Sequence, residues 1–183
     1  MNLFLIGYRG SGKTTVAAVL AEQIGWPWID ADTELERRAA MTIKQIFAEQ
    51  GEPAFRDLES TVLQDLAARQ SHVVALGGGI VLRPENRRVL KDRGKTVWLQ
   101  ASPEALLRRI GDDPTTSDRR PNLTGQGGLV EIRTLLDERT PLYAECADLT
   151  IDAEDKSPAE IARQIIVELG LEKFGLKKFG LKN

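Results

Sequence analysis

The chain has 183 residues, a length that fits one domain with one hydrophobic core. Hydrophobic residues make up 42% and the formal net charge is -2, so the basic excess typical of nucleic-acid-binding proteins is missing. The single cysteine, Cys146, excludes a disulfide framework and a cysteine zinc site. The N-terminal apolar run is too short for a signal peptide, and no stretch approaches the roughly 20 apolar residues of a membrane span. We therefore expect a cytoplasmic protein that binds neither nucleic acid nor membranes.

Short apolar runs alternate with segments of helical periodicity along the chain. The pattern predicts strands at 3–6, 26–29, 72–76, 95–99 and 148–151, and helices at 13–24, 33–40, 43–50, 53–69, 84–92, from 103, 129–136 and 158–169. This alternation favours a parallel sheet with helices on both faces. Residues 111–128 break the periodicity and are rich in glycine, proline and polar residues, which predicts a mobile loop. Residues 1–170 would form the domain, and 171–183 a loosely docked tail.

A glycine-rich motif follows the first predicted strand. Residues 7–14 read Gly-Tyr-Arg-Gly-Ser-Gly-Lys-Thr, which fits G-x-x-x-x-G-K-[S/T] between a strand and an amphipathic helix. Backbone amides of such a loop and the helix N-terminus bind phosphate oxygens. The lysine reaches the terminal phosphates, and the threonine offers a hydroxyl to Mg²⁺. The residues expected to hold ATP phosphates are Gly10, Ser11, Gly12, Lys13, Thr14 and Thr15.

The motif predicts nucleotide binding but leaves the reaction open. A GTPase switch would need a guanine-reading Asn-Lys-x-Asp segment, which the sequence lacks. An ATP-driven machine would usually end its third strand in a Walker-B aspartate, whereas here three glycines, 77–79, follow that strand. Both classes are therefore disfavoured.

Two aspartates follow the second predicted strand. In an extended segment, Asp30 and Asp32 would point the same way and face the phosphate loop. One carboxylate could then hold a Mg²⁺-bound water, and the other could accept the proton of an attacking hydroxyl. The alternative is that Asp32 caps the next helix. Local sequence does not decide between the two.

Two arginines and a glycine run each have a functional and a purely structural interpretation. Arg56 precedes Glu59 by three residues and could form only a solvated ion pair. The three glycines could be a plain turn, or they could let a ligand approach the backbone closely. Arg139 is expected near a helix end, where it could simply oppose the helix dipole.

Taken together, these features resemble the shikimate kinase family. The motifs occur in the family's order: the phosphate loop, Asp-x-Asp, Gly-Glu-x-x-Phe-Arg-x-x-Glu, Gly-Gly-Gly, Arg-Pro and Arg-x-Pro-x-Tyr. The resemblance covers nearly the whole chain up to the tail. It implies a P-loop α/β/α sandwich with five parallel strands, of the nucleoside monophosphate kinase type.

The resemblance also implies a role for each motif. Lys13, Asp32 and Arg120 would be catalytic, with Asp32 as the base. Thr14 and Asp30 would bind Mg²⁺, and the co-substrate would be ATP. The carboxylate of shikimate would be held by Arg56 and Arg139, and its hydroxyls by Gly78 and Gly79. Arg109 or Arg108 and Pro158 would flank adenine, with Lys156 near it.

Within the expected lid at 111–128, the segment 111–119 is longer than is usual in the family and adds a second arginine, Arg119, next to Arg120. Arg120 is favoured as the lid arginine because it precedes Pro121. The alternatives are a gluconate kinase, another small-molecule kinase of the same fold, or a non-catalytic nucleotide-binding regulator. A monomer is expected.

Overall fold

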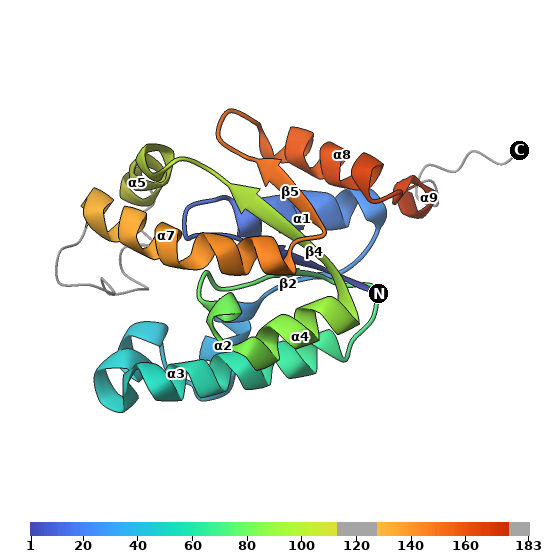
Figure 1. Ribbon diagram of the computed structural model, residues 1–183. Helices are drawn as coiled ribbons and strands as arrows, with labels where there is room; N and C mark the ends of the chain where they lie inside the picture. Colours follow the sequence, from blue (N-terminus) through green and yellow to red (C-terminus); the bar gives the residue numbers. More distant parts are fainter. Residues whose placement is uncertain (113–127, 176–183) are drawn as a thin grey trace, which may run out of the picture.

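A five-stranded parallel sheet lies at the centre of the computed structural model, which describes residues 1–112 and 128–175 (Figure 1). The strands are β1 (Asn2–Ile6), β2 (Trp28–Asp30), β3 (Val73–Ala75), β4 (Gly94–Gln100) and β5 (Leu149–Asp152). Their order in the sheet is β2-β3-β1-β4-β5, and every neighbouring pair is parallel. The expected five-stranded P-loop fold is therefore confirmed.

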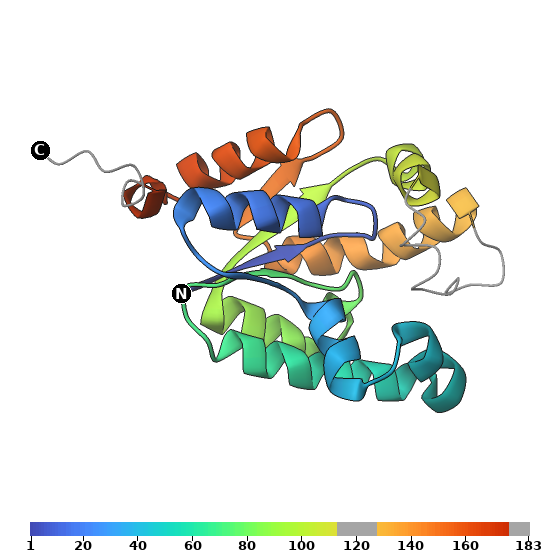
Figure 2. The same cartoon turned by 180° about the vertical axis from the view of Figure 1, so that it is seen from behind.

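Helices cover both faces of the sheet, as the two opposite views show (Figures 1 and 2). One face packs against α1 (Lys13–Ile24) and α8 (Pro158–Glu168). The other packs against α3 (Ile43–Ala67), α4 (Pro84–Arg93) and α7 (Gly128–Cys146). The shorter elements are α2 (Ala31–Ala39), η1 (Ile80–Leu82), α5 (Pro103–Asp112) and α9 (Glu172–Gly175).

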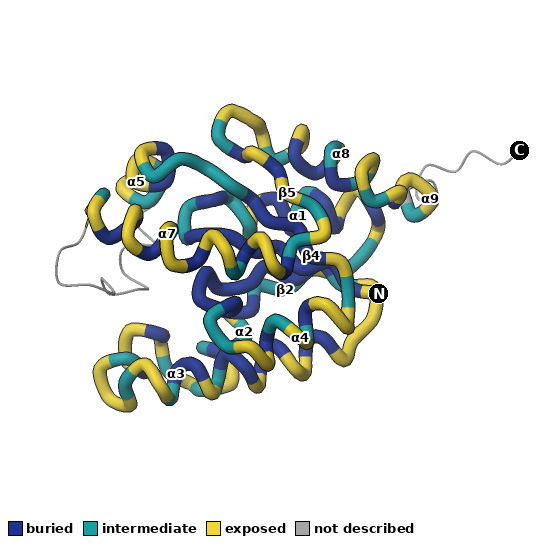
Figure 3. Tube along the Cα trace, in the orientation of Figure 1, coloured by how far each residue is buried: buried dark blue, intermediate teal, exposed yellow. Residues whose placement is uncertain are grey.

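Strand β1 explains why the N-terminal run is continuously apolar. Leu3 and Leu5 belong to the core on the α1 side, whereas Phe4 and Ile6 belong to the core on the α3 side. All four side chains are fully buried because successive residues of a strand face opposite sides of the sheet. Figure 3 shows the buried positions gathered in the strands and on the inner faces of the helices.

Most predicted elements lie where the periodicity placed them, and α1 has the predicted bounds. Strand β2 begins at Trp28, two residues later than expected. The two predicted helices at 43–50 and 53–69 join into α3, with a kink at Gly51, whose φ of 81° and ψ of 172° are not helical. A left-handed φ of this kind suits glycine.

Helix α7 corrects the prediction for Arg139. The helix continues past residue 136 and through Pro141 to Cys146, so Arg139 lies in its interior. Proline removes only one helical hydrogen bond, and the fully buried Tyr143 beyond it packs into the core. Packing of Tyr143 in the core therefore keeps the helix intact beyond Pro141, although proline usually ends a helix.

The start of the expected tail packs against the domain. Leu171 is buried, and the centre of the Phe174 ring lies 5.1 Å from that of Trp26 in an edge-on arrangement.

Within residues 1–112 and 128–175, no helix is both long and apolar enough to span a membrane.

Candidate active site

The candidate site lies at the carboxyl edge of the sheet, where the chain leaves β1, β2 and β3. Strand β1 has a strand added on each side, β3 and β4, so the order of the chain reverses there. Ligands of open parallel sheets bind at such a switch point. The phosphate loop follows β1 directly and therefore occupies this position.

Three glycines give the phosphate loop its shape. Gly7 has a φ of 138°, and a Cβ on it would overlap the carbonyl oxygen of Leu99. Gly10 and Gly12 have φ values of 80° and 89°, and Gly12 is the N-cap of α1. No side chain of the described residues caps this helix, which leaves its first amides to bind an anionic ligand.

The ammonium group of Lys13 lies inside the loop. It donates hydrogen bonds to the carbonyl oxygens of Gly7 and Tyr8, at 2.9 and 2.8 Å, and to Ser11 Oγ at 3.4 Å. These hydrogen bonds therefore keep the oxygen atoms of the loop gathered around the ammonium group of the lysine. This arrangement places a cation where bound phosphates would carry negative charge.

Thr14 and Asp30 form the pair expected at a Mg²⁺ site. Thr14 Oγ1 donates a 2.7 Å hydrogen bond to Asp30 Oδ2, which joins the first turn of α1 to the end of β2. Both side chains offer the hard oxygen atoms that Mg²⁺ prefers. Among the described residues, no three His, Cys, Asp or Glu side chains cluster closely enough to hold a metal. Phosphate oxygens and water would have to complete the coordination.

The structure corrects how the two aspartates are related. Asp30, not Asp32, is the helix N-cap: its Oδ1 accepts hydrogen bonds from the amides of Asp32 and Thr33, at 3.0 and 3.1 Å. Asp32 lies in the first turn of α2 and is half-buried. The premise of an extended Asp-Ala-Asp segment is therefore wrong, although both carboxylates lie at the carboxyl end of β2.

Arg56 is a buried arginine fixed by two glutamates. Its Nη1 donates to Glu59 Oε2 at 2.7 Å, and its Nη2 donates to Glu52 Oε1 at 2.9 Å. Its guanidinium lies against Gly79, where a Cβ would come within 2.6 Å of Arg56 Cζ. The solvated ion pair considered from the sequence is thus wrong, and Gly79 is glycine because an arginine occupies the space above it.

Arg139 and Tyr143 reach Gly78 from α7. The Tyr143 hydroxyl donates to the carbonyl oxygen of Gly78, and Arg139 Nη1 donates to the same oxygen at 3.4 Å. Arg139 is 5% exposed, and its buried Nε has no hydrogen-bond partner among the described residues. A buried donor of this kind is costly unless a ligand pairs with it.

Gly78 also touches the phosphate loop. A Cβ at this position would lie 3.3 Å from the carbonyl oxygen of Gly7 and 3.5 Å from the amide nitrogen of Arg9. The glycine run is therefore in contact with the loop on one side and with the two arginines on the other. The structure brings the expected phosphate site and the expected acceptor site next to each other.

Of the described residues expected around adenine, only Arg109 is hydrogen-bonded to the phosphate loop. Arg109 donates to the carbonyl oxygens of Ala153 and Glu154, at 2.6 and 2.7 Å, and lies 3.5 Å from the carbonyl oxygen of Gly10. It thus joins α5, the loop after β5 and the phosphate loop. Lys156 instead bonds to Gln164 on α8, and Pro158 is the first residue of that helix. Thr15 is exposed in the first turn of α1.

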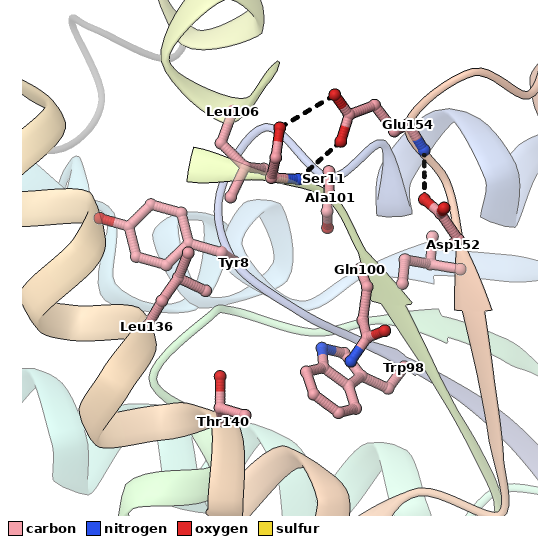
Figure 4. Close-up of a pocket in the computed structure, with 12 residues that line it drawn as sticks. Tyr8, Ser11, Trp98, Gln100, Ala101, Leu106, Leu136, Thr140, Asp152 and Glu154 are labelled. Carbon is pink, nitrogen blue, oxygen red and sulfur yellow. Dashed lines mark hydrogen bonds between the residues drawn. The ribbon is translucent and has the colours of Figure 1, made fainter. Parts of the chain in front are cut away.

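A pocket of about 300 Å³ opens next to the phosphate loop, between β4, β5, α5 and α7 (Figure 4). Its wall includes Trp98 and Leu136, and Ser102 is hydrogen-bonded to the carboxylate of Glu154. These two hydrogen bonds from Ser102, through its amide and its hydroxyl, lower the pKa of Glu154. Of the described residues predicted to form the site, only Ser11 lines this pocket, and none of those expected to hold the acceptor does.

Sequence reasoning missed the two variable positions of the loop, Tyr8 and Arg9. Tyr8 is 3% exposed, and burial raises the pKa of its hydroxyl although the charge of Arg9 opposes the shift. Arg9 Nη2 forms a 2.9 Å ion pair with Oε1 of the buried Glu131. The available signal was Glu131 itself, a glutamate spaced with Ile132 and Leu135 on the apolar face of a helix.

Arg120, the expected lid arginine, and its neighbour Arg119 lie outside the described residues, as does most of the expected lid.

Three comparisons identify relatives of this chain. The family model for shikimate kinase matches residues 9–170. A shikimate kinase from Rhodopirellula baltica is 42% identical over 165 residues, which cover 90% of this chain and 88% of that protein. The solved structure of shikimate kinase from Acinetobacter baumannii in complex with shikimate is 37% identical, with a TM-score of 0.86, and the match covers 99% of this chain and 95% of that one.

A solved gluconokinase from Sinorhizobium meliloti is also similar, but only in fold. It is 18% identical, with a TM-score of 0.59, over 100% of this chain and 97% of that one. The family match over residues 9–170 and the 42% identity over 90% of this chain are much stronger. This chain belongs to the shikimate kinase family.

Proposed function

We propose that this protein transfers the terminal phosphate of ATP to a hydroxyl of shikimate and forms 3-phosphoshikimate. The observation that carries the proposal is Arg139, a buried arginine beside the phosphate loop whose Nε has no hydrogen-bond partner among the described residues. A planar carboxylate can accept two parallel hydrogen bonds from a guanidinium. Shikimate has one carboxylate, and its hydroxyls can accept phosphate.

The nucleotide would bind along the phosphate loop. The amides of residues 10–15 would hold the phosphates, and Lys13 would turn from the loop carbonyl oxygens toward the β- and γ-phosphates. Thr14 Oγ1 would hold Mg²⁺ through a lone pair while its proton stays donated to Asp30, and Asp30 would hold the ion through water. A Mg²⁺ ion held there would neutralise phosphate charge.

The acceptor would bind on the other side of the glycine run. Arg56 and Arg139 would hold its carboxylate, and the backbone of Gly78 and Gly79 would meet its hydroxyls. The glutamate pairs of Arg56 fix its guanidinium before any ligand arrives, so little conformational entropy is lost on binding. Because Gly78 touches the phosphate loop, an acceptor held there would lie next to the transferring phosphate.

Asp32 would accept the proton from the attacking hydroxyl. It follows Asp30 in the first turn of α2, close to the Thr14 side of the loop, and its half-buried carboxylate lies at the carboxyl end of β2. A carboxylate placed at an attacking hydroxyl is a common base in phosphoryl transfer. Arg120 would stabilise the charge on the transferring phosphate.

For the adenine we propose Arg109 on one side and Pro158 on the other, with Lys156 nearby. Arg109 supports this role because it already joins α5 to the loop after β5 and to Gly10. All proposed groups come from one chain, so we propose that a monomer is sufficient for activity.

A coupled ADP-release assay tests the proposal. Shikimate, gluconate and nucleoside monophosphates are compared as acceptors with ATP, in the presence of Mg²⁺ and after its removal with a chelator. We expect ADP release that depends on both shikimate and Mg²⁺. Release with gluconate or a nucleotide, but not with shikimate, would contradict the assignment of the substrate.

A further inference from the structure

The two variable positions of the phosphate loop both dock onto the helices that follow β4 and precede β5. The ring of Tyr8 packs in a small apolar cluster with Leu106 of α5 and with Ile132 and Leu135 of α7. The guanidinium of Arg9 lies 5.9 Å from the centre of that ring and pairs with Glu131 of α7. An apolar contact and an ionic contact therefore join the loop to α7.

The Arg9–Glu131 pair is almost completely removed from water. The two side chains are 13% and 0% exposed, and the ion-pair distance is 2.9 Å. Taking both charges out of water costs about as much as their attraction returns, so such a pair adds little to overall stability. The pair nevertheless restricts where the two side chains can lie, because both are almost completely buried and water cannot replace the partner. The pair thus fixes an arrangement more than it strengthens the fold.

Helix α7 makes contact with both halves of the proposed site. Glu131 in its first turn holds the phosphate loop, and Arg139 in its interior reaches Gly78 on the acceptor side. The two residues are eight positions apart, which corresponds to about 12 Å along a helix axis. The rigid helical segment between Glu131 and Arg139 therefore sets the distance between the groups that these two residues contact.

We propose that Arg9 and Glu131 are positioning residues that lock the phosphate loop to α7 and so fix the transferring phosphate relative to the acceptor held by Arg139. This inference rests on the proposed kinase function. Each ligand keeps its own contacts when the pair is lost, so binding of either one alone changes little. The reaction slows because donor and acceptor are no longer aligned, and small misplacements of reacting groups strongly reduce rates.

The test uses four variants and a matched control. Arg9→Met and Glu131→Gln each break the pair, whereas Arg9→Met/Glu131→Met removes both of its charges and serves if a single variant fails to fold. Arg9→Lys keeps the positive charge. The control is Arg133→Met, because Arg133 of α7 also pairs with α5, through Glu104, but both of these side chains are about half exposed.

The measurements are kcat at saturating substrates, the separate Kd values of ATP and shikimate by calorimetry, and Tm. We expect each pair-breaking variant to lower kcat about tenfold or more while both Kd values stay within about threefold of wild type. The double variant should be no slower than the single variants, since contacting residues act non-additively. Arg9→Lys and Arg133→Met should keep kcat near that of wild type.

Several results would overturn the inference. Wild-type kcat in the folded double variant would make the pair merely structural, as would a lower Tm with unchanged kcat in the single variants. A large rise in the Kd of ATP for Arg9→Met, but not for Glu131→Gln, would mean that Arg9 contacts the nucleotide directly. If the wild-type protein releases no ADP with shikimate, the proposed function fails and this inference fails with it. An active wild type with unaffected variants contradicts the inference alone.

Discussion

The donor and acceptor sides of the site are built in different ways. The proposed donor side is a continuous stretch, residues 7–14, in which backbone amides arranged by Gly7, Gly10 and Gly12 would be the main ligands. The acceptor side is assembled from side chains of α3 and α7 and from the glycines after β3. Local conformation therefore determines the first, whereas packing between distant elements determines the second.

This difference indicates where each half is vulnerable. A backbone-lined loop depends mainly on its few glycines, on one lysine and on the Arg9–Glu131 pair that joins it to α7. A site lined by buried arginines depends on every neighbour that fixes a guanidinium. Substitutions on the donor side should therefore reduce catalysis, whereas substitutions on the acceptor side should mainly weaken the binding of shikimate.

The largest effect is expected for Lys13→Ala. Removing the cation proposed to face the transferring phosphate should lower kcat about 10³-fold with Tm nearly unchanged, because the side chain contacts the loop and not the hydrophobic core. The assay is steady-state ADP release, with circular dichroism to monitor folding. Lys44→Ala, at an exposed lysine, is the matched control. Wild-type turnover in folded Lys13→Ala would rule out the P-loop mechanism.

Asp32→Asn should have the next largest effect, on the step that joins the two sides. An amide keeps the shape of the side chain but cannot accept the proton, so kcat should fall about 10²-fold while the Kd of ATP changes little. Asp30→Asn should instead weaken the response to Mg²⁺, because Asp30 pairs with Thr14. Titration of both variants with Mg²⁺ separates the roles, and identical profiles would assign both aspartates to the metal site.

Arg139→Met should act on the acceptor side alone. Losing a charge-assisted bond of about 2 kcal/mol should raise the KM for shikimate about 30-fold and leave the KM for ATP near its wild-type value. Arg133→Met on the same helix serves as the control because Arg133 is exposed. An equal rise in both KM values would show that Arg139 does not distinguish the two sides.

Gly79→Ala should give the smallest effect and the finest test of the comparison. Its φ of -98° suits alanine, so any defect comes from the added methyl group, which would overlap the guanidinium of Arg56. Displacing that group should raise the KM for shikimate about tenfold. Gly111→Ala is the control, because a Cβ there meets no described atom within 4 Å. An unaltered KM for shikimate would mean that Arg56 lies away from the substrate.

The sequence predicted the donor side better than the acceptor side. The phosphate loop was predictable because its residues are adjacent and its glycines adopt the turns that the motif requires. The strands and most helices followed from apolar periodicity, as in β1 and α1. The length of α7 was not predictable, since buried Tyr143 holds the helix together beyond Pro141.

On the acceptor side, local sequence could not separate function from structure. Arg56 looked like a solvated ion pair, and only the fold places it over Gly79. The extended Asp-Ala-Asp premise failed because Asp30 ends its strand by capping α2. The Arg9–Glu131 pair joins residues 122 positions apart, and no periodicity encodes such a contact.

The most direct test of the central claim is phosphorus NMR of a reaction containing the protein, ATP, Mg²⁺ and shikimate. The account predicts that the γ-phosphate signal of ATP is replaced by that of a single phosphate monoester of shikimate, formed in equal amount to ADP. Inorganic phosphate without an ester, or an ester formed only when gluconate replaces shikimate, would contradict it.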